Sequence, residues 1–468
     1  MRWSRWSHFG GGRVGGVAGV FGLVAILAAC GGGGGGSGGG GGSTGPTGPK
    51  NATVSCPSNV NTNTAAVEKG SITLVVSTWG ADPSEIKLDQ DGFNSFTQKY
   101  PNIKIDYQPI PSNYDQKMQA NVASGNVPDV FYVDQNMAQT YIPAGKLLNL
   151  SPYLKRDGVS PSDYYPQLQH DFDCADGTVF GIPKDFGTLG LVYNKTMFQA
   201  AGLQPPDSNW TWTDLQNAAK KLTNTSGSSK VYGISTSADP ARWMAFLYAA
   251  GGQVLSSDGK TAKFNSQAGV DSANFWSSFR NAGTGVLPGD VGAGWNGDAF
   301  GNQKVAMTFE GGWMIPFMTA SFPNVQYGIG PMPKAPNGKS SDLLFTNAWG
   351  AYAGTKHADA AAKLVEWMTG QTIETNVLKA GFALPTIKSI VNTQADWLNQ
   401  NTPLNQNSKQ LLENAQNGVS WFYGAPHTEL VNDTTSALQA IMLNHADAKT
   451  QLDQAAQKVD TWIQQNGP

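Results

Sequence analysis

Aromatic rings recur within a few residues of carboxylates or amides at six places where a strand or loop is predicted to end. The pairs are Trp79 and Asp82, Tyr132 and Asp134, Asp185 and Phe186, Asp239 and Trp243, Glu310 and Trp313, and Asn347 and Trp349. A sugar ring has C–H faces that lie on aromatic rings, and its rim of hydroxyls both donates and accepts hydrogen bonds, which carboxylates and amides satisfy. One such pair is more often a core aromatic beside a helix cap, but six pairs indicate a site for a hydroxyl-rich ligand.

A β-α-β-α-β segment is predicted to position the first two pairs. Strands are expected over residues 72–76, 103–107 and 129–133, with a helix carrying Phe93, Phe96 and Tyr100 between the first two and a helix over 114–124 before the third. This order implies a parallel sheet with right-handed crossovers. Ligands sit outside the carboxyl ends of such strands, so Trp79, Asp82, Asp134 and Gln135 are candidate ligand-binding residues.

A second region is predicted to carry the other pairs. Strands are expected near 178–182, 187–193, 231–236, 305–309 and 347–353, and helices near 213–223, from Asp239, and over 357–368. Thr213 and Gln216 have the spacing of a capping box. Asp239 opens a helix, and Glu310-Gly311-Gly312-Trp313 follows a strand. The last 75 residues read as helices.

Composition narrows the classes of protein. Without the N-terminal segment about 400 residues remain to fold, which is too many for one core and predicts two lobes. The net charge is -3 with 14% charged residues, and no basic stripe is present, so nucleic acid is excluded as a partner. The sequence has no His-Glu-x-x-His, no Gly-x-Ser-x-Gly and no phosphate loop, so we expect no metal, no cofactor and no catalytic residues.

The N-terminus has the features of a secretory signal. Arginines precede an uncharged run of 14 residues, Val14–Leu27, and Leu27-Ala28-Ala29 stands before Cys30. A membrane-spanning helix needs about 20 residues, so residues 1–29 are predicted to be removed. The Leu-Ala-Ala-Cys end resembles the lipobox of bacterial lipoproteins, which implies that Cys30 becomes a lipidated N-terminus. The glycine-rich residues 30–70 would then be a disordered tether with a mean reach of roughly 35 Å. Cys56 and Cys174 are the remaining cysteines, and in an oxidising compartment we expect them to pair.

Several segments together resemble one family, the extracellular sugar-binding lipoproteins of bacterial ABC importers (solute-binding protein family 1), which includes the maltose-binding protein. The resemblance covers about residues 71–445. Its segments are Trp79-Gly80, Val127-Pro128-Asp129-Val130, Gly145-Lys146-Leu147-Leu148, Gly181-Ile182-Pro183 with Tyr193-Asn194-Lys195, Trp212-Thr213-Asp214-Leu215, Gly311-Gly312-Trp313, Ala362-Lys363-Leu364-Val365-Glu366-Trp367, and Glu413-Asn414-Ala415-Gln416.

The resemblance implies an α/β fold of the periplasmic-binding-protein type (type II). Each of its two lobes would be a mostly parallel sheet flanked by helices. The first lobe would comprise residues 71–183 and 346–386, and the second residues 184–345 and 387–468. Three hinge crossings are expected near residues 183, 345 and 386, with the ligand in the cleft between the lobes.

The resemblance also assigns roles to residues. Asp134 corresponds to the first-lobe carboxylate that holds sugar hydroxyls, Asp185 to the acid at the hinge, Asp239 to the second-lobe acid, and Trp313 to a stacking ring. Where the maltose-binding protein has an aromatic two residues after the second-lobe acid, this chain has Ala241, followed by Arg242 and Trp243. Trp349, Trp421 and Tyr423 are further candidates for ligand contact.

The function implied is that of a solute-binding protein. A monomer anchored to the outer face of the membrane through Cys30 would capture a carbohydrate and deliver it to the permease of an ABC transporter. Two alternatives remain open. Arg242 would suit a glycerophosphodiester or another anionic solute, and two of the carboxylates Asp134, Asp185, Asp239 and Glu310 could serve a surface glycoside hydrolase.

Overall fold

A computed structural model describes residues 54, 56–80, 83–226 and 230–467, which belong to one structural unit, Gly45–Pro468. The strands are β1 Ile72–Ser77, β2 Ile103–Tyr107, β3 Val130–Val133, β4 Gly181–Asn194, β5 Tyr232–Ser235, β6 Gly285–Val286, β7 Val305–Gly311, β8 Tyr327–Gly330, β9 Asp342–Ala351 and β10 Gly418–Ser420. The helices are α1 Pro83–Lys99, α2 Tyr114–Ser124, α3 Gln135–Tyr141, α4 Ser151–Asp157, α5 Pro166–Gln169, α6 Lys195–Ala200, α7 Trp212–Leu222, α8 Pro240–Ala249, α9 Gln267–Asn281, α10 Asn296–Gly301, α11 Met314–Ser321, α12 Ala358–Met368, α13 Gln371–Lys379, α14 Lys388–Thr393, α15 Ala395–Leu398, α16 Pro403–Ala415, α17 His427–Asn444 and α18 Ala448–Asn466.

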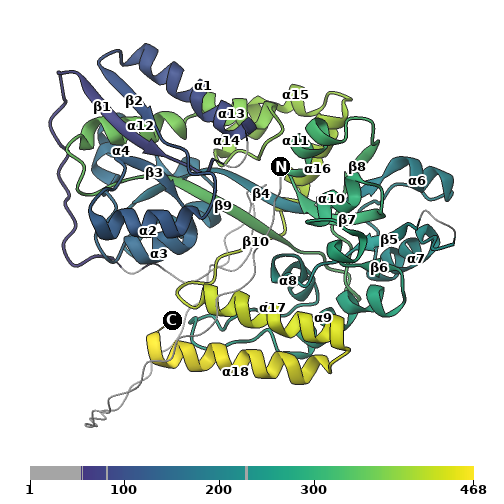
Figure 1. Ribbon diagram of the computed structural model, residues 1–468. Coiled ribbons are helices and arrows are strands. Elements are labelled where there is room, and N and C mark those ends of the chain that lie inside the picture. Colours follow the sequence, from purple (N-terminus) through teal and green to yellow (C-terminus); the bar gives the residue numbers. More distant parts are fainter. Residues whose placement is uncertain (1–53, 55, 81–82, 227–229, 468) are drawn as a thin grey trace, which may run out of the picture. The chain divides into compact units, whose positions relative to one another are not determined.

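The described strands form one mixed sheet in the order β2-β1-β3-β9-β4-β7-β5-β6, with β10 beside β9 and β8 beside β4 (Figure 1). We call β1, β2 and β3 the first half of the sheet, and β5, β6 and β7 the second half. Pairing is parallel between β1 and its neighbours and between β5 and its neighbours. The predicted β-α-β-α-β unit is confirmed. However, β4 and β9 run antiparallel to their partners in the main order, so the sheet is less parallel than expected.

Two long strands, β4 and β9, connect the halves. β4 pairs with β9 between Gly181 and Thr188 and then with β7 between Leu189 and Tyr193. The sequence had predicted two strands here, and the structure corrects this to a single strand of 14 residues. The register shifts between Pro183 and Asp185. A proline cannot donate to the ladder, so an irregularity lets the strand continue past it.

Helix starts follow local sequence rules. Asp134 caps α3 by accepting from Met137 N, and Asp239 caps α8 by accepting from Ala241 N, with Pro240 in the first turn. The capping box of α7 is formed by Thr211 and Asp214, not by Thr213 and Gln216 as predicted. The helix therefore begins one residue earlier, at Trp212.

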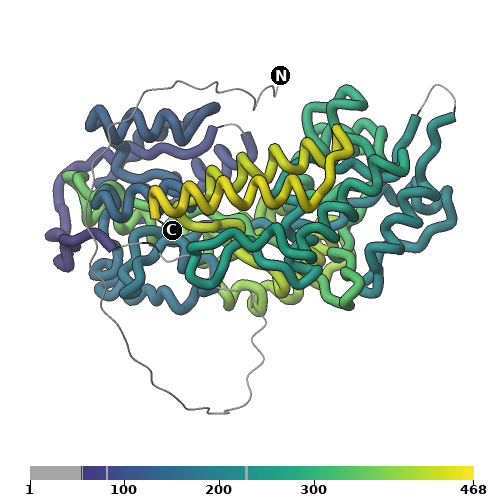
Figure 2. The backbone as a smooth tube through the Cα atoms, turned by 90° about the horizontal axis from the view of Figure 1, so that it is seen from below, coloured from purple at the N-terminus to yellow at the C-terminus, as the bar shows by residue number. Residues whose placement is uncertain are grey.

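The C-terminal helices α17 and α18 pack side by side as an antiparallel pair and contact α9 (Figure 2). Their buried faces, which include Leu430, Leu438, Leu452 and Val459, join the hydrophobic cluster of the second half. Among the residues that the structure describes, no helix has the length and hydrophobicity needed to span a bilayer.

Residues 56–70 have partners on the first half of the sheet and its helices. Asn149 Nδ2 donates to the carbonyl oxygen of Asn61 at 2.9 Å, and Ala65 N donates to the hydroxyl of Tyr153 at 2.9 Å. Glu68 Oε2 lies 2.6 Å from His357 Nδ1. This part of the predicted tether is therefore fastened to the folded body. Cys30 and the predicted signal segment lie outside the described residues.

Candidate ligand-binding site

Strand ends and the two long strands place the predicted site residues in two clusters. Trp79 follows β1 and Asp134 follows β3 in the first half, while Asp239 lies beyond β5, and Glu310 and Trp313 lie at the end of β7, in the second half. Asp185 of β4 pairs with Asn347 of β9 between the two halves. Asp82 lies outside the described residues. Each cluster contacts β4, the first through Lys184 and the second through Gly187.

The second-half cluster is centred on the Trp313 indole. Its Nε1 donates to Glu310 Oε2 at 2.8 Å, and the Arg242 guanidinium carbon lies 5.7 Å from the centre of its ring. Arg242 Nη2 donates to the same Glu310 oxygen at 2.6 Å, and Asn296 Nδ2 donates to Glu310 Oε1 at 2.9 Å. Glu310 is fully buried, with both carboxylate oxygens bonded. It therefore orients Trp313 and Arg242, and leaves no oxygen free for a ligand.

Two glycines make room for that indole. A Cβ added to Gly187 would lie 3.1 Å from Trp313 Cζ3, and one added to Gly311 would lie 2.4 Å from the same atom. Phe345 of β9 meets the indole edge-on, with ring centres 5.8 Å apart. Trp421, which is partly exposed, packs on Phe345 at 5.9 Å. A partly exposed aromatic surface thus lies along β4 and β9.

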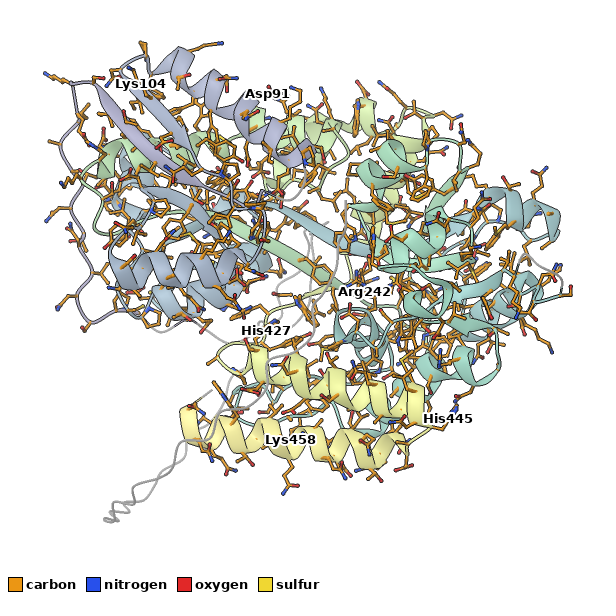
Figure 3. The ribbon with its side chains drawn as sticks, in the orientation of Figure 1. Asp91, Lys104, Arg242, His427, His445 and Lys458 are labelled. Atoms are coloured by element: carbon orange, nitrogen blue, oxygen red, sulfur yellow. The ribbon has the colours of Figure 1, made fainter. Side chains whose placement is uncertain are left out.

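Asp239 is the accessible acid of this cluster. Its Oδ2 accepts from Arg242 Nη1 at 2.8 Å, and its side chain keeps 36% exposure, compared with 1% for Glu310. Arg242, which Figure 3 labels, lies in the first turn of α8. Burial alone would lower the pKa of Arg242, but Glu310 and Asp239 raise it above its ordinary value. The guanidinium is therefore charged, and two carboxylates compensate it.

The first-half cluster joins Trp79 to two buried tyrosines. Trp79 meets Tyr114 and Tyr132 edge-on, with ring centres 6.0 and 5.5 Å apart. The Tyr114 hydroxyl donates to the carbonyl oxygen of Tyr132 at 3.0 Å. Trp79 itself stays partly exposed, so part of its ring is available to a ligand.

Asp134 and Gln135 follow the last residue of β3. Burial, and then the nearby Asp115 carboxylate, raise the pKa of Asp134 above its ordinary value. The neighbouring Gln135 donates through Nε2 to Asp171 Oδ2 at 3.3 Å, and Ser420 Oγ donates to the same oxygen at 2.9 Å. Gln135 is thus engaged with the segment around β10, and Asp134 is the acid of this cluster that has a partly exposed side chain.

A buried lysine that sequence reasoning missed lies beside Asp185. Lys184 Nζ bonds to Asp185 Oδ2 at 2.5 Å and to Glu85 Oε1 of α1 at 3.0 Å, and it lies 4.7 Å from the centre of the Tyr132 ring. The Tyr132 hydroxyl in turn donates to Asp89, whose pKa is raised by burial to about 7. Because the sequence predicted a break between strands at residue 184, it gave no sign that this lysine lies inside a buried strand.

A small pocket lies against the Lys184 network. It is open to solvent and is lined partly by Asp185, Trp349 and Phe382. Asp185 is 7% exposed and already paired with Lys184. Its role in the structure is therefore to compensate a buried cation at the junction of the two halves.

Several predicted ligand contacts are corrected by burial. Trp243 is fully buried and donates through Nε1 to Ser272 Oγ of α9 at 3.0 Å, so it belongs to the core. Tyr423 is also in the core, 2% exposed and stacked on His427, which Figure 3 marks at the start of α17. Phe186 is buried against Tyr165.

Asn347 and Trp349 of β9 are buried as well. Trp349 packs between Phe93 and Tyr132, with ring centres 5.9 and 4.5 Å away, and reaches only the small pocket described above. Asn347 is 3% exposed, and its Nδ2 has no hydrogen-bond partner among the described atoms. That unsatisfied N–H group could still donate a hydrogen bond to an acceptor placed between the halves.

The two remaining predicted residues form part of a different cluster. Cys56 and Cys174 are thiols whose sulfur atoms, with a carboxylate oxygen of Asp176, lie within 4.8 Å of one another. Within the described ranges this is the group of side chains with the spacing of metal ligands. Their pairing as a disulfide stays a prediction.

Comparison with known proteins identifies relatives of the whole described body. The family described as "Bacterial extracellular solute-binding protein" matches residues 81–373. A galactooligosaccharide-binding protein of Bacillus subtilis is 22% identical over 366 residues, which cover 76% of this chain and 81% of that protein.

Solved structures share the same fold. An ABC substrate-binding protein from Listeria monocytogenes in complex with cycloalternan superposes with a TM-score of 0.75 at 22% identity, covering 84% of this chain and 99% of that one. UgpB from Mycobacterium tuberculosis in complex with glycerophosphocholine gives a TM-score of 0.72 at 19% identity, covering 83% and 98%. The predicted periplasmic-binding-protein fold (type II) is confirmed.

Proposed function

Because the chain belongs to the bacterial extracellular solute-binding protein family, we propose that it captures a sugar or oligosaccharide and delivers it to the permease of an ABC transporter. The observation that carries this proposal is the Trp313 indole, held by Glu310 and Gly187 beside the exposed carboxylate of Asp239. A partly exposed indole and an accessible acid that share the neighbour Arg242 suit a pyranose, which offers C–H groups and hydroxyls together. The B. subtilis relative named for galactooligosaccharide agrees with this ligand class.

An anionic ligand is disfavoured by the charges in the two clusters. Arg242 is paired with Asp239 and Glu310, and Lys184 with Asp185 and Glu85. A phosphate binding beside Arg242 would meet the Asp239 carboxylate at the same guanidinium, and like charges repel. The glycerophosphodiester alternative, which the fold of UgpB keeps open, would require Asp239 to move away.

Catalysis of glycoside hydrolysis is disfavoured by the state of the carboxylates. A glycosidase needs one carboxylic acid to protonate the leaving oxygen and a second carboxylate across the bond. Both oxygens of Glu310 are bonded, and Asp185 is bonded to a buried lysine. Asp134 and Asp239, the other two candidates, follow strands in different halves of the sheet. Because the family binds solutes, we propose a binding protein without enzymatic activity, and chromatography of oligosaccharides after incubation with the protein tests this directly.

Capture is proposed to proceed by closure of two lobes about β4, β9 and a third crossing near residue 386. The first lobe would comprise residues 71–183 and 346–386, and the second residues 184–345 and 387–468. A ligand that contacts both lobes only when they approach stabilises the closed state by its differential affinity for that state. The permease would then recognise the closed form.

The location proposed for the protein is outside the cell membrane, where its family acts. The signal-like residues 1–29 and the Leu-Ala-Ala-Cys sequence support lipidation of Cys30. The lipid would attach the protein, as a monomer, to the outer face of the cell membrane. Mass spectrometry of the N-terminal peptide from membranes tests this part of the proposal independently of ligand binding.

A thermal-shift screen tests the ligand class. A ligand that binds the native state raises the melting temperature in proportion to the logarithm of its concentration over Kd. Mono-, di- and oligosaccharides, glycerophosphocholine and glycerol-3-phosphate are compared at equal concentrations. We expect a rise with at least one saccharide and none with the phosphates. A rise with the phosphodiester alone would contradict the proposal and support the alternative.

A further inference from the structure

Cys56 and Cys174 are separated by more than 100 residues in the sequence but are brought together by the backbone. Val54 forms a parallel β-bridge with Cys174, and Cys56 stands two residues farther along the same segment. Val54 is fully buried, and Cys174 is 2% exposed. Because this buried backbone contact holds the segment around Val54 in place, the fold itself brings the two sulfur atoms close together.

The Cys174 side of the pair is a tight turn. Cys174 N donates to the carbonyl oxygen of Thr178 and Gly177 N donates to the carbonyl oxygen of Cys174, each at 2.9 Å, with Gly177 at a φ of 84°. Cys56 Sγ reaches Asp176 of the same turn at 3.4 Å. The turn therefore places both a thiol and a carboxylate beside the segment that carries Cys56.

We propose that Cys56 and Cys174 are joined by a disulfide in the exported protein, and that this bond fixes the place where the N-terminal chain leaves the body. The bond would complete a row of attachments that already includes Asn61 with Asn149, Ala65 with Tyr153, and Glu68 with His357. The proposal rests on the extracellular location of the family, and does not depend on which ligand is bound.

The chemistry requires a disulfide oxidant, such as an extracytoplasmic thiol–disulfide oxidoreductase. Burial raises the pKa of the Cys174 thiol, so the more exposed Cys56 is the thiol that attacks first. Its thiolate breaks the S–S bond of the oxidant and forms a mixed disulfide. Cys174 then attacks the Cys56 sulfur, and the oxidant leaves as a dithiol that carries both protons and both electrons.

A metal ion is the competing occupant of this group. The group offers two thiolates and one carboxylate, whereas structural zinc is held by four ligands, and the described side chains supply no fourth at this spacing. A buried thiol with a raised pKa is also a weaker source of thiolate for a metal. Disulfide formation is therefore the chemistry that the pair supports best.

Peptide mapping of the exported full-length protein tests the bond. Free thiols are alkylated under denaturing conditions without reductant, and the protein is then digested with trypsin. Lysine and arginine positions place Cys56 in peptide 51–69 and Cys174 in peptide 157–184. We expect these two peptides to be joined and to separate when reductant is added. Alkylation of both thiols, with or without bound zinc, or a link from Cys56 to the peptide that contains Cys30, would overturn the proposal.

Limited proteolysis tests the consequence of the bond. Cleavage after Lys69 should be roughly fivefold faster in Cys56→Ser, because local opening of a segment sets its cleavage rate. Reduced wild-type protein should match the variant, and the variant should not respond to reductant. Equal cleavage rates in oxidised and reduced wild-type protein would overturn the anchoring role. The saccharide-induced thermal shift is measured on the same samples, and its loss in wild-type protein would contradict the proposed function and leave the disulfide result intact.

Discussion

The Trp313 indole packs against Gly187, so that an aromatic side chain from the end of β7 lies on the long strand β4 that joins the two halves of the sheet. A Cβ at position 187 would lie 3.1 Å from Trp313 Cζ3, so the ring would have to shift by a few tenths of an ångström. The absence of a side chain on the strand thus determines where the ring stands. Gly187, Trp313 and the acids beside Arg242 give three predictions, and the buried carboxyl group of Asp171 gives a fourth.

Replacement of Gly187 by Val should displace the indole without removing it. Valine favours strands, but its side chain overpacks the site beside the indole, so we expect the free energy of unfolding of the apo protein to fall by about 1–3 kcal/mol. Affinity for the saccharide identified by thermal shift should fall about tenfold, or about 1.4 kcal/mol, by isothermal titration calorimetry. Gly289→Val, at a glycine with open space around it, is the matched control. Equal affinity in both variants would contradict the assigned place of Trp313.

Replacement of Trp313 by Ala should abolish the ligand-induced thermal shift. The indole is partly exposed, so its loss should leave the apo melting temperature within about 5 °C of wild type. Trp462→Ala, at a partly buried tryptophan of α18, serves as the control and should retain the shift. A large drop in apo stability for Trp313→Ala would instead identify the ring as a core residue.

Removing the charge of Asp239 should weaken ligand affinity, whereas removing the charge of Glu310 should lower the stability of the protein. Asn is also a good helix cap, so Asp239→Asn should keep α8 and weaken saccharide affinity about tenfold. Glu310→Gln should lower the free energy of unfolding by about 3 kcal/mol, because it leaves a buried cation undercompensated. Urea unfolding and calorimetry separate the effects. If Asp239→Asn instead creates binding of glycerophosphocholine, Asp239 is the group that excludes phosphate.

Stability should decline as pH rises through the range in which Asp171 titrates. Burial raises the pKa of Asp171 from 3.8 to about 7. Between these values the unfolded chain loses a proton that the folded protein keeps, so the free energy of unfolding falls by up to about 1.4 kcal/mol per pH unit. Asp171→Asn, which can still accept from Ser420, should flatten this slope. Urea unfolding at pH 5, 6, 7 and 8 measures it, and an unchanged slope in the variant would refute the assignment.

Elements with strong local patterns could be predicted from the sequence. β2 and α2 have the expected limits, and Asp239 caps the helix that it was expected to open. These features depend on residues within one or two turns of each other. The limits of β2 and α2 therefore followed from local rules, whereas β4 and β9, which pair with distant segments, have other limits than those expected.

Burial of individual aromatics could not be predicted, because it depends on contacts between distant segments. α8 is apolar on nearly all sides, with Trp243, Met244, Phe246 and Leu247 all buried. A helix of this kind gives no pattern that separates a core side from a ligand side. The same holds for Lys184, whose partner Glu85 lies about 100 residues away in the sequence.

The arrangement of β4 and β9 has a consequence for dividing the protein into fragments. β9 pairs with β3 of the first half, β4 pairs with β7 of the second half, and β4 and β9 pair with each other, so the chain passes from one half to the other and back again. A single cut in the gene cannot release either half as an autonomous piece. Any fragment that contained one half would carry unpaired strand edges and would aggregate unless its complement were supplied in the same cell.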